Sequence, residues 1–311
     1  MTPALAAKLP KAWTGANPQE GWHRCGQLQD SFRYCRSVTR HHARSFYFSS
    51  FPLPDEKKMA AYAIYAFCRY IDDVIDESED CGTGNNTRHA PTREILRQAV
   101  LDIEKGNSPL PFADAFREVN RQYGIENELY FDLIEGCCRD REPVELKTFE
   151  ELEEYCYYVA SVVGLMMSKI FGLQEPHGIP YAVDMGIAMQ LTNILRDIRE
   201  DYEMGRIYLP EEEWAEFAVS RDHFETGRVD SAWRDYLQMQ VNRARDYYRR
   251  GEEGLCFLDD DGSRKTAALM AKVYSGILDV IEKRQYDVFS ARAFVPTWKK
   301  LSIALQFALQ R

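Results

Sequence analysis

The sequence has no apolar run close to the roughly 18 residues that a membrane-spanning helix requires. Its N-terminus lacks the basic stretch followed by an apolar one that marks a secretory signal. Eight cysteines are present but form no CxxC pair, so a zinc site is not expected. From these absences we expect reduced thiols and a cytoplasmic protein, with any membrane contact confined to its periphery.

Basic residues are the minority charge, with 39 Lys and Arg against 49 Asp and Glu and a net charge of −10. Nucleic-acid binding needs clustered Lys and Arg to neutralise phosphates, so we expect no nucleic-acid partner. An anionic substrate remains open, because bound metal ions can supply the positive charge. The 45% of hydrophobic residues is ample for a core.

Alternating, strand-like stretches are nearly absent, whereas helical spacing runs almost continuously from residue 31. We therefore predict one all-α domain over residues 31–311, preceded by an N-terminal arm over residues 1–30. One helix is expected to begin at Pro54 or Asp55, and residues 81–92 read as a loop. The other expected helices cover residues 31–44, 92–105, 111–123, 126–139, 148–171, 181–204, 231–251, 263–286 and 296–310.

The helix that begins near Pro54 ends in an acidic face. Asp72 and Asp76 are four residues apart, which places both carboxylates on one side, about 6 Å apart along the axis. Arg69 and Asp73 share that face, and the preceding residues are apolar on nearly every side, as in a buried helix. Carboxylates ending a buried helix are costly unless they are paired or bind metal. A solvated helix end is the alternative.

A second acidic face lies on the helix predicted over residues 181–204. Its amide and carboxylate side chains recur at positions i, i+3, i+7 and i+11, namely Gln190, Asn193, Asp197 and Asp201. A solvated face would more typically mix Lys and Glu. Hard cations such as Mg²⁺ prefer oxygen ligands and usually retain substrate phosphates in their shell. The two faces together therefore predict a clamp for a metal–diphosphate substrate.

Arginines lie beside both acidic faces, at Arg69, Arg196 and Arg206. A guanidinium group can give two parallel hydrogen bonds to phosphate oxygens. Simple ion pairing with the neighbouring aspartates is the alternative, and both can hold in different ligation states.

Three ordered motifs resemble those of the squalene/phytoene synthase family. The first runs from His42 through Ser45 and Phe46 and continues over residues 65–76. The second is the tyrosine-rich segment over residues 155–164, and the third is QLTNILRDIREDYEMGRIYLP over residues 190–210. The resemblance extends over roughly residues 31–290. It implies the isoprenoid synthase fold, a single-domain helical bundle around a central apolar cavity.

The resemblance also implies the chemistry and its residues. Two prenyl diphosphates would be joined head to head through a cyclopropylcarbinyl diphosphate, with three Mg²⁺ ions. The implied metal ligands are Asp72, Asp76, Asn193, Asp197 and Asp201. The implied diphosphate-binding residues are Ser45, Arg69, Gln190, Arg196 and Arg206. The implied catalytic polar or aromatic residues are His42, Tyr157, Tyr158 and Tyr274.

Some of these residues have plainer interpretations. His42 follows another histidine and has the character of a helix-end residue at the surface. Tyr157 and Tyr158 could be core aromatics, and since neighbours on a helix differ by about 100°, only one is expected to face the cavity directly. Ser161 stands where many relatives of the family have glycine.

Product identity depends on chain length and on how the last cation is quenched. Ser49 and Ser50 are small, and if they face the cavity they leave room for geranylgeranyl diphosphate and hence phytoene. The alternative is farnesyl diphosphate, leading to presqualene diphosphate, squalene or dehydrosqualene, with NADPH needed only for squalene. A remote alternative is a non-catalytic assembly factor with the same fold. The sequence leaves monomer and homodimer open.

The C-terminal segment from Phe294 to Gln310 is apolar and carries two adjacent lysines. It could lie on a membrane surface and help release a water-insoluble product. The alternative is a last helix packed on the core.

Overall fold

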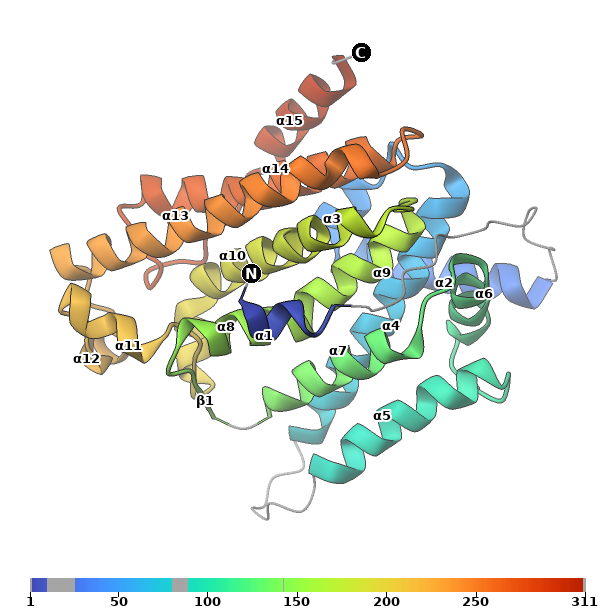
Figure 1. The fold of residues 1–311 in the computed structure, drawn as a ribbon, viewed down its shortest axis with the longest axis horizontal. Helices are drawn as coiled ribbons and strands as arrows, with labels where there is room; N and C mark the ends of the chain where they lie inside the picture. The colour runs from blue at the N-terminus through green and yellow to red at the C-terminus, as the bar shows by residue number, and fades with distance from the viewer. Residues whose placement is uncertain (1, 10–25, 80–88, 142, 310–311) are drawn as a thin grey trace.

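The computed structural model describes residues 2–9, 26–79, 89–141 and 143–309, and these fold almost entirely into helices, as predicted (Figure 1). The first half contains α1 Pro3–Ala6, α2 Gly26–His42, α3 Arg44–Ser49, α4 Asp55–Glu79, α5 His89–Glu104, α6 Ala113–Tyr123 and α7 Asn127–Arg139. The second half contains α8 Phe149–Cys156, α9 Val162–Ile170, α10 Ile179–Glu203, α11 Glu211–Trp214, α12 Arg221–Thr226, α13 Ser231–Glu253, α14 Ser263–Lys283 and α15 Thr297–Leu309.

Helix α10 is the centre of the bundle. It packs against α9, α13 and α14 and against the π-helical turn η1 Tyr157–Ser161. Figure 1 shows α13 and α14 on one side of α10 and α5 on the outer side of α7, while α15 projects beyond α14. The second acidic motif therefore sits on the most heavily packed helix of the bundle.

Most helix boundaries match the sequence expectation, but residues 148–171 do not form one regular helix. Thr148 caps α8 through a reciprocal capping box with Glu151. The helix then widens into η1 before continuing as α9, at the tyrosine-rich motif. Single π-turns inside α-helices are rare and occur frequently at functional sites.

The chain also contains elements that the sequence did not predict. Strands β1 Val144–Glu145 and β2 Arg206–Ile207 form a two-residue parallel ladder that pairs Val144 with Arg206. Short 3₁₀ turns are η2 Pro176–Gly178, η3 Ala215–Phe217 and η4 Gly254–Phe257. The expected loop over residues 81–92 lies mostly outside the described residues.

The division of the chain at residue 30 stays a prediction. That position falls inside α2, and Leu5 of the expected arm is buried in the main core. None of the described helices combines the length and apolar character needed to cross a membrane. The six described cysteines are free thiols.

A close contact fixes η1 against α10. An added Cβ at Gly186 would lie 2.5 Å from the Ser161 Cα and 2.8 Å from its backbone nitrogen. The Ser161 hydroxyl of η1 also donates a 2.9 Å hydrogen bond to the Val183 carbonyl of α10. Because backbone atoms form the contact, neither helix can yield without shifting the cavity wall.

We predict that Gly186→Ala lowers the midpoint of thermal unfolding. The gain in helix propensity, up to about 1 kcal/mol, is outweighed because overpacking against backbone typically costs about 1–3 kcal/mol. Differential scanning calorimetry measures the shift. Gly26→Ala is the matched control, since nothing lies within 4 Å of a Cβ there. Equal effects of the two substitutions would contradict the proposed contact.

Candidate active site

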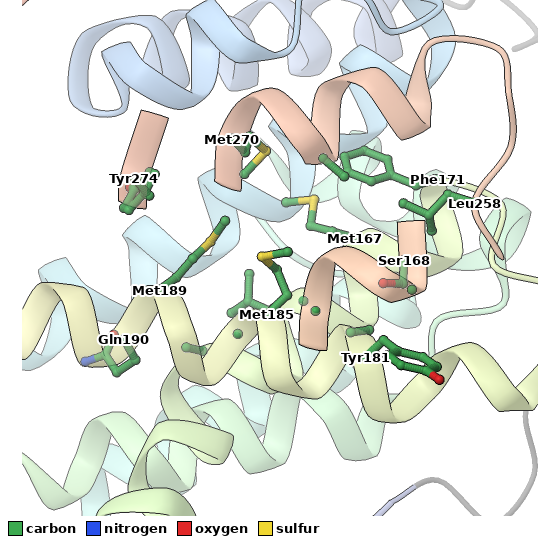
Figure 2. A pocket seen from close by; sticks show the side chains of 18 of the residues that line it. Met167, Ser168, Phe171, Tyr181, Met185, Met189, Gln190, Leu258, Met270 and Tyr274 are labelled. Atoms are coloured by element: carbon green, nitrogen blue, oxygen red, sulfur yellow. The ribbon is translucent and has the colours of Figure 1, made fainter. Parts of the chain in front are cut away.

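An elongated apolar cavity of about 290 Å³ lies between α9, α10 and α14. Four methionines line its middle, and Figure 2 shows them converging from these three helices: Met167, Met185, Met189 and Met270. Phe171, Tyr181 and Leu258 lie at one end of the cavity. Methionine side chains are flexible and polarisable, so this wall suits a long hydrocarbon of variable shape.

Polar side chains gather at the opposite end, where Figure 2 places Gln190 and Tyr274. Asn193 and Tyr65 also line the cavity, and the Asn193 amide donates a 3.2 Å hydrogen bond to the Gln190 side-chain oxygen. Three of the predicted site residues therefore meet at the polar end, and Tyr65 of α4 joins them.

Two tyrosines at this end, Tyr65 and Tyr274, lie near the two acidic helix faces. Burial raises the pKa of Tyr65 to about 12, and this hydroxyl interacts with Asp72, Arg69 and Tyr274. Burial also raises the pKa of Tyr274, which interacts in turn with Arg196 and Asp197. Tyr65 therefore lies near the first acidic face and Tyr274 near the second, so both faces lie close to the polar end of the cavity. Both hydroxyls are protonated at neutral pH.

Asp197 is held by two arginines. The Arg196 Nε lies 2.8 Å from its Oδ1, and the Arg292 Nε lies 2.9 Å from the same oxygen. Arg292 also approaches Glu200 at 3.5 Å. Two guanidinium groups thus converge on the acidic face of α10, close to the polar end of the cavity.

Asp201, one turn further along α10, has less compensation. Burial raises its pKa to about 7, with a further contribution from the charge of Asp197, and the nearby Arg206 opposes the rise. Burial disfavours the ionised form of this carboxylate, and an additional positive charge nearby would stabilise it. Arg206, which lies in strand β2, is positioned beside Asp201. The sequence analysis had noted only that Arg206 lies near the acidic face along the chain.

The acidic face of α4 is partly described. Arg69 forms an ion pair with Asp73, one turn along the helix, and its buried Nε has no hydrogen-bond partner among the described residues. Asp72 is exposed. The side chain of Asp76 lies outside the described residues. The unsatisfied Arg69 Nε is a donor that suits an anion.

The oxygen donors fit a hard divalent cation, although no three His, Cys, Asp or Glu side chains in the described part of the chain converge enough to hold one alone. Asp197, Asp201 and Asn193 offer two carboxylates and an amide on one helix face. A Mg²⁺ ion bound here would take its remaining ligands from water and substrate phosphates, which is its usual preference. Asp197 and Asp201 are both partly buried on this face, so a bound cation would compensate their negative charge.

A small pocket beside the polar end adds two cations that sequence reasoning missed. It is lined by Ser45, Arg196, Tyr274, Arg292 and Lys300 together with apolar residues. The Lys300 ammonium group donates a 2.8 Å hydrogen bond to the Ser45 hydroxyl. Burial lowers the pKa of Lys300. The basic residues of the C-terminal segment were the available signal, but the sequence did not show that this segment folds back onto α3.

The structure places the remaining predicted residues off the cavity wall. His42 is exposed at the end of α2, one residue before the cavity-lining Ala43. Neither Tyr157 nor Tyr158 lines the cavity, whereas Val159 of the same turn does. Their catalytic roles stay predictions.

Both tyrosines face the N-terminal segment instead. The Tyr157 hydroxyl donates to the Lys8 carbonyl at 3.1 Å, and the Lys8 ammonium donates to the Tyr158 hydroxyl at 2.8 Å and to Glu154 at 2.7 Å. The Thr2 amide donates to Glu153 at 2.9 Å. The described residues 2–9 therefore fasten α8 and η1 from the side away from the cavity.

The serines expected to leave room for a longer chain do not line the cavity either. Ser49 and Ser50 are buried, and the Ser50 hydroxyl lies 2.7 Å from that of Tyr62. Their small size therefore gives no direct information on substrate length.

Comparison with known proteins adds to this geometry. Residues 39–299 match the family model described as squalene/phytoene synthase. The chain is 37% identical over 287 residues to a 15-cis-phytoene synthase of Synechococcus elongatus, covering 88% of this chain and 91% of that protein. It is 35% identical to a phytoene synthase of Arthrospira platensis, covering 88% of this chain and 90% of that protein.

Solved structures show the same architecture. A dehydrosqualene synthase, solved in complex with a ligand, is 31% identical, with a TM-score of 0.81 over 91% of this chain and 96% of that chain. A squalene synthase from Alicyclobacillus acidocaldarius is 25% identical, with a TM-score of 0.75 over 85% of this chain and 97% of that chain. The predicted isoprenoid synthase fold is therefore confirmed.

We predict that Asp201→Asn stabilises the metal-free protein at pH 8. An unfolded aspartate titrates near 3.8 and the folded Asp201 near 7, so the wild-type protein loses stability as the pH rises between these values. The variant escapes this loss, and the difference should vanish toward pH 4. Thermal unfolding at pH 5 and pH 8 measures it.

Mg²⁺ provides a second readout for the same variant. At pH 8 the ion should raise the unfolding midpoint of the wild-type protein more than that of Asp201→Asn, because the variant has lost one of the predicted carboxylate ligands. Asp260→Asn, at an exposed position, is the control and should behave like wild type. A parallel pH dependence of Asp201→Asn and wild type would contradict the assignment.

We predict that Lys8→Met destabilises the fold by about 1 kcal/mol, a modest value because the ammonium group is partly exposed. The substitution removes its bonds to Glu154 and Tyr158. Chemical denaturation gives the free energy of unfolding. Lys147→Met removes a comparable but more exposed ion pair, with Glu211, and should have little effect. If both substitutions cost the same, the N-terminal contacts do not fasten η1.

Proposed function

Since the chain belongs to the squalene/phytoene synthase family and is a prenyltransferase, we propose that it joins two geranylgeranyl diphosphates head to head into phytoene. The supporting observation is an apolar cavity with amides at one end and carboxylates and guanidinium groups beside that end. A prenyl diphosphate has the same division into a hydrocarbon tail and an anionic head. Membership of this enzyme family leaves the non-catalytic alternative without support.

Mg²⁺ is the proposed metal, with Asp72, Asp76, Asn193, Asp197 and Asp201 as its protein ligands. Three ions are proposed by analogy with the family. Bound Mg²⁺ would neutralise the diphosphate and stabilise the charge that develops on it as it leaves. The donor set supports this assignment, because every proposed ligand is an oxygen donor.

The basic side chains would bind and orient the diphosphates. Arg196 and Arg292 already converge on Asp197, and diphosphate oxygens carry the same charge as that carboxylate. Arg69 offers an unsatisfied buried donor, while Lys300 and Ser45 lie on the wall of the adjacent pocket. Gln190 and Arg206 complete the proposed set. Their fixed positions would hold the reacting carbons of two substrates together.

The cavity wall would protect the cationic intermediates. Methionine, valine and alanine side chains offer no nucleophilic oxygen, and the apolar lining excludes water. The faces of Tyr65 and Tyr274 can stabilise positive charge without capturing it. The raised pKa of Tyr65 keeps its hydroxyl from serving as a base at neutral pH, so the released diphosphate is the proposed proton acceptor. Tyr157, Tyr158 and His42 stay predicted catalytic residues.

A C30 product is the second candidate. The dehydrosqualene synthase structure, with its TM-score of 0.81, favours farnesyl diphosphate as an alternative substrate. NADPH would be needed only if the product is squalene. We also propose that a water-insoluble product leaves through peripheral contact with a membrane. Monomer and homodimer remain alternatives.

The test is to incubate the purified protein with Mg²⁺ and either farnesyl or geranylgeranyl diphosphate, with and without NADPH, in detergent. We expect phytoene from the C20 substrate, independently of NADPH. A C30 hydrocarbon formed in preference would replace phytoene as the product. No lipid product and no diphosphate release under any condition would refute the enzyme proposal.

Metal assignment is tested separately by Asp72→Asn and Asp197→Asn. Loss of one ligand should lower turnover by at least about 100-fold, as expected for groups that stabilise a leaving-group charge. Circular dichroism should show an unchanged helix content. Asp260→Asn controls for the loss of one negative charge at the surface. A variant that keeps near-normal turnover would remove that residue from the proposed ligand set.

A further inference from the structure

The end of the cavity opposite the polar side chains is closed in part by residues 254–259, which follow α13 and are called the closing turn below. Leu255 and Leu258 of this turn line the cavity, and Figure 2 shows Leu258 beside Phe171 at that end. The Asp259 amide donates a 3.0 Å hydrogen bond to the Phe171 carbonyl, which joins the turn to the end of α9. A long hydrocarbon tail that entered from the polar end would meet these side chains last.

A lysine of α4 holds the closing turn from outside the cavity. The Lys57 ammonium group lies 2.7 Å from a carboxylate oxygen of Asp259 and 2.9 Å from one of Asp261. These three residues form the Lys57 cluster. The ammonium group also lies 3.2 Å from the hydroxyl of Ser263, the first residue of α14. The Lys57 side chain is only 14% exposed, so water screens these ion pairs less than those of a surface lysine.

Two glycines let the backbone approach the cluster closely. Gly172 follows Phe171 and has a φ of +85°, and an added Cβ there would overlap the Asp259 carboxylate. Gly262 has a φ of +109°, and an added Cβ would overlap the carbonyl of Pro52, just before α4. Side chains rarely tolerate either conformation. The backbone at both positions is therefore shaped to bring α4, α9 and the start of α14 together around the cluster.

Helix α4 connects the cluster with the polar end of the cavity. Lys57 lies in its first turn, Tyr65 lines the cavity, and Asp72 belongs to the first acidic face. Fifteen residues separate Lys57 from Asp72, which corresponds to about 22 Å along the helix axis. One helix therefore carries both an acidic face of the proposed diphosphate site and the lysine that holds the opposite end of the cavity.

We propose that Lys57 is a positioning residue that limits the length of the hydrocarbon tail the cavity accepts. By pairing with Asp259 and Asp261 it keeps Leu258 in place at the far end, so a longer tail would have to displace the closing turn. Without the ammonium group the two carboxylates repel each other, and the turn loosens. Ion pairs outside the cavity then decide substrate length together with the side chains that line it. The identity of the tail rests on the proposed function, whereas the closing turn and its ion pairs do not.

A purely structural role of Lys57 is the alternative. Loss of its ion pairs would then lower the stability of the fold and weaken the binding of all tails alike. The two roles differ in how affinity depends on tail length, because each methylene adds about fourfold only while the tail still finds room. The Arg264 guanidinium also donates a 2.9 Å hydrogen bond to the Leu258 carbonyl. Since this contact does not involve Lys57, its loss should loosen the turn without unfolding it.

Saturated alkyl diphosphates test the proposal by calorimetry in the presence of Mg²⁺. They lack the allylic double bond needed for ionisation, so they bind without reacting. The series runs from chains shorter than farnesyl to chains longer than geranylgeranyl. In the wild-type protein, affinity should rise about fourfold per methylene and stop rising at a limiting length. Lys57→Met should move this limit to longer chains and strengthen the binding of the longest ones about tenfold or more, whereas the shortest should bind as in wild type.

Lys58→Met is the matched control, since it removes the same charge from the next residue. The Lys58 ammonium group pairs at 3.1 Å with Asp55, whose side chain is 99% exposed. This variant should leave the limiting length unchanged. Leu258→Ala removes atoms of the cavity wall without touching the ion pairs and should move the limit in the same direction as Lys57→Met. If Lys57→Met does not fold, Asp261→Asn removes one partner of the cluster and should shift the limit in the same direction.

Three outcomes would overturn the proposal: an equal loss of affinity at every chain length in Lys57→Met, an equal shift in Lys58→Met, or a wild-type protein without a limiting length. Product formation from prenyl diphosphates, measured in parallel, keeps this proposal apart from the proposed function. A limit that moves in Lys57→Met without any lipid product from the wild-type protein would refute the proposed function alone. Product formation with an unmoved limit would refute the role of Lys57 alone.

Discussion

Negative charge gathered on one face of α10, at the polar end of an apolar cavity, is the constraint on which the rest of the site depends. Burial opposes ionisation there, as the pKa of Asp201 shows. Two arginines compensate the charge of Asp197: Arg196 on α10 and Arg292 in the loop before α15. The negative charge of Asp201 is compensated less completely, so a bound cation would stabilise the ionised carboxylate on this face.

The cavity owes its shape to contacts on its outer side. Gly186 allows the backbone of Ser161 to approach α10, and the described residues 2–9 fasten the other side of η1 through Lys8. The π-helical turn η1, a rare conformation, is thus contacted on two sides while Val159 lines the cavity. The same contacts therefore place Val159 on the cavity wall and turn Tyr157 and Tyr158 toward the N-terminal segment.

Sequence reasoning predicted the helices well, because helical spacing and capping signals such as Thr148 are local. It missed η1 and the β1–β2 ladder, since neither has a local signal. Among the predicted site residues, Gln190, Asn193 and Tyr274 do meet at the cavity, as helix spacing and the family resemblance implied. Arg292 and Lys300 escaped notice because their part in the site depends on how the C-terminal segment folds back, a long-range contact that no local pattern encodes.

Calorimetric titration of inorganic pyrophosphate into the wild-type protein distinguishes a metal clamp from a purely basic site. Pyrophosphate carries the anionic head of the substrate without its tail, so it reports on the clamp alone. Mg²⁺ should tighten pyrophosphate binding at least tenfold, and Asp197→Asn should abolish the increase. Equal affinity with and without Mg²⁺ would contradict the metal clamp, because the arginines alone would then account for the site.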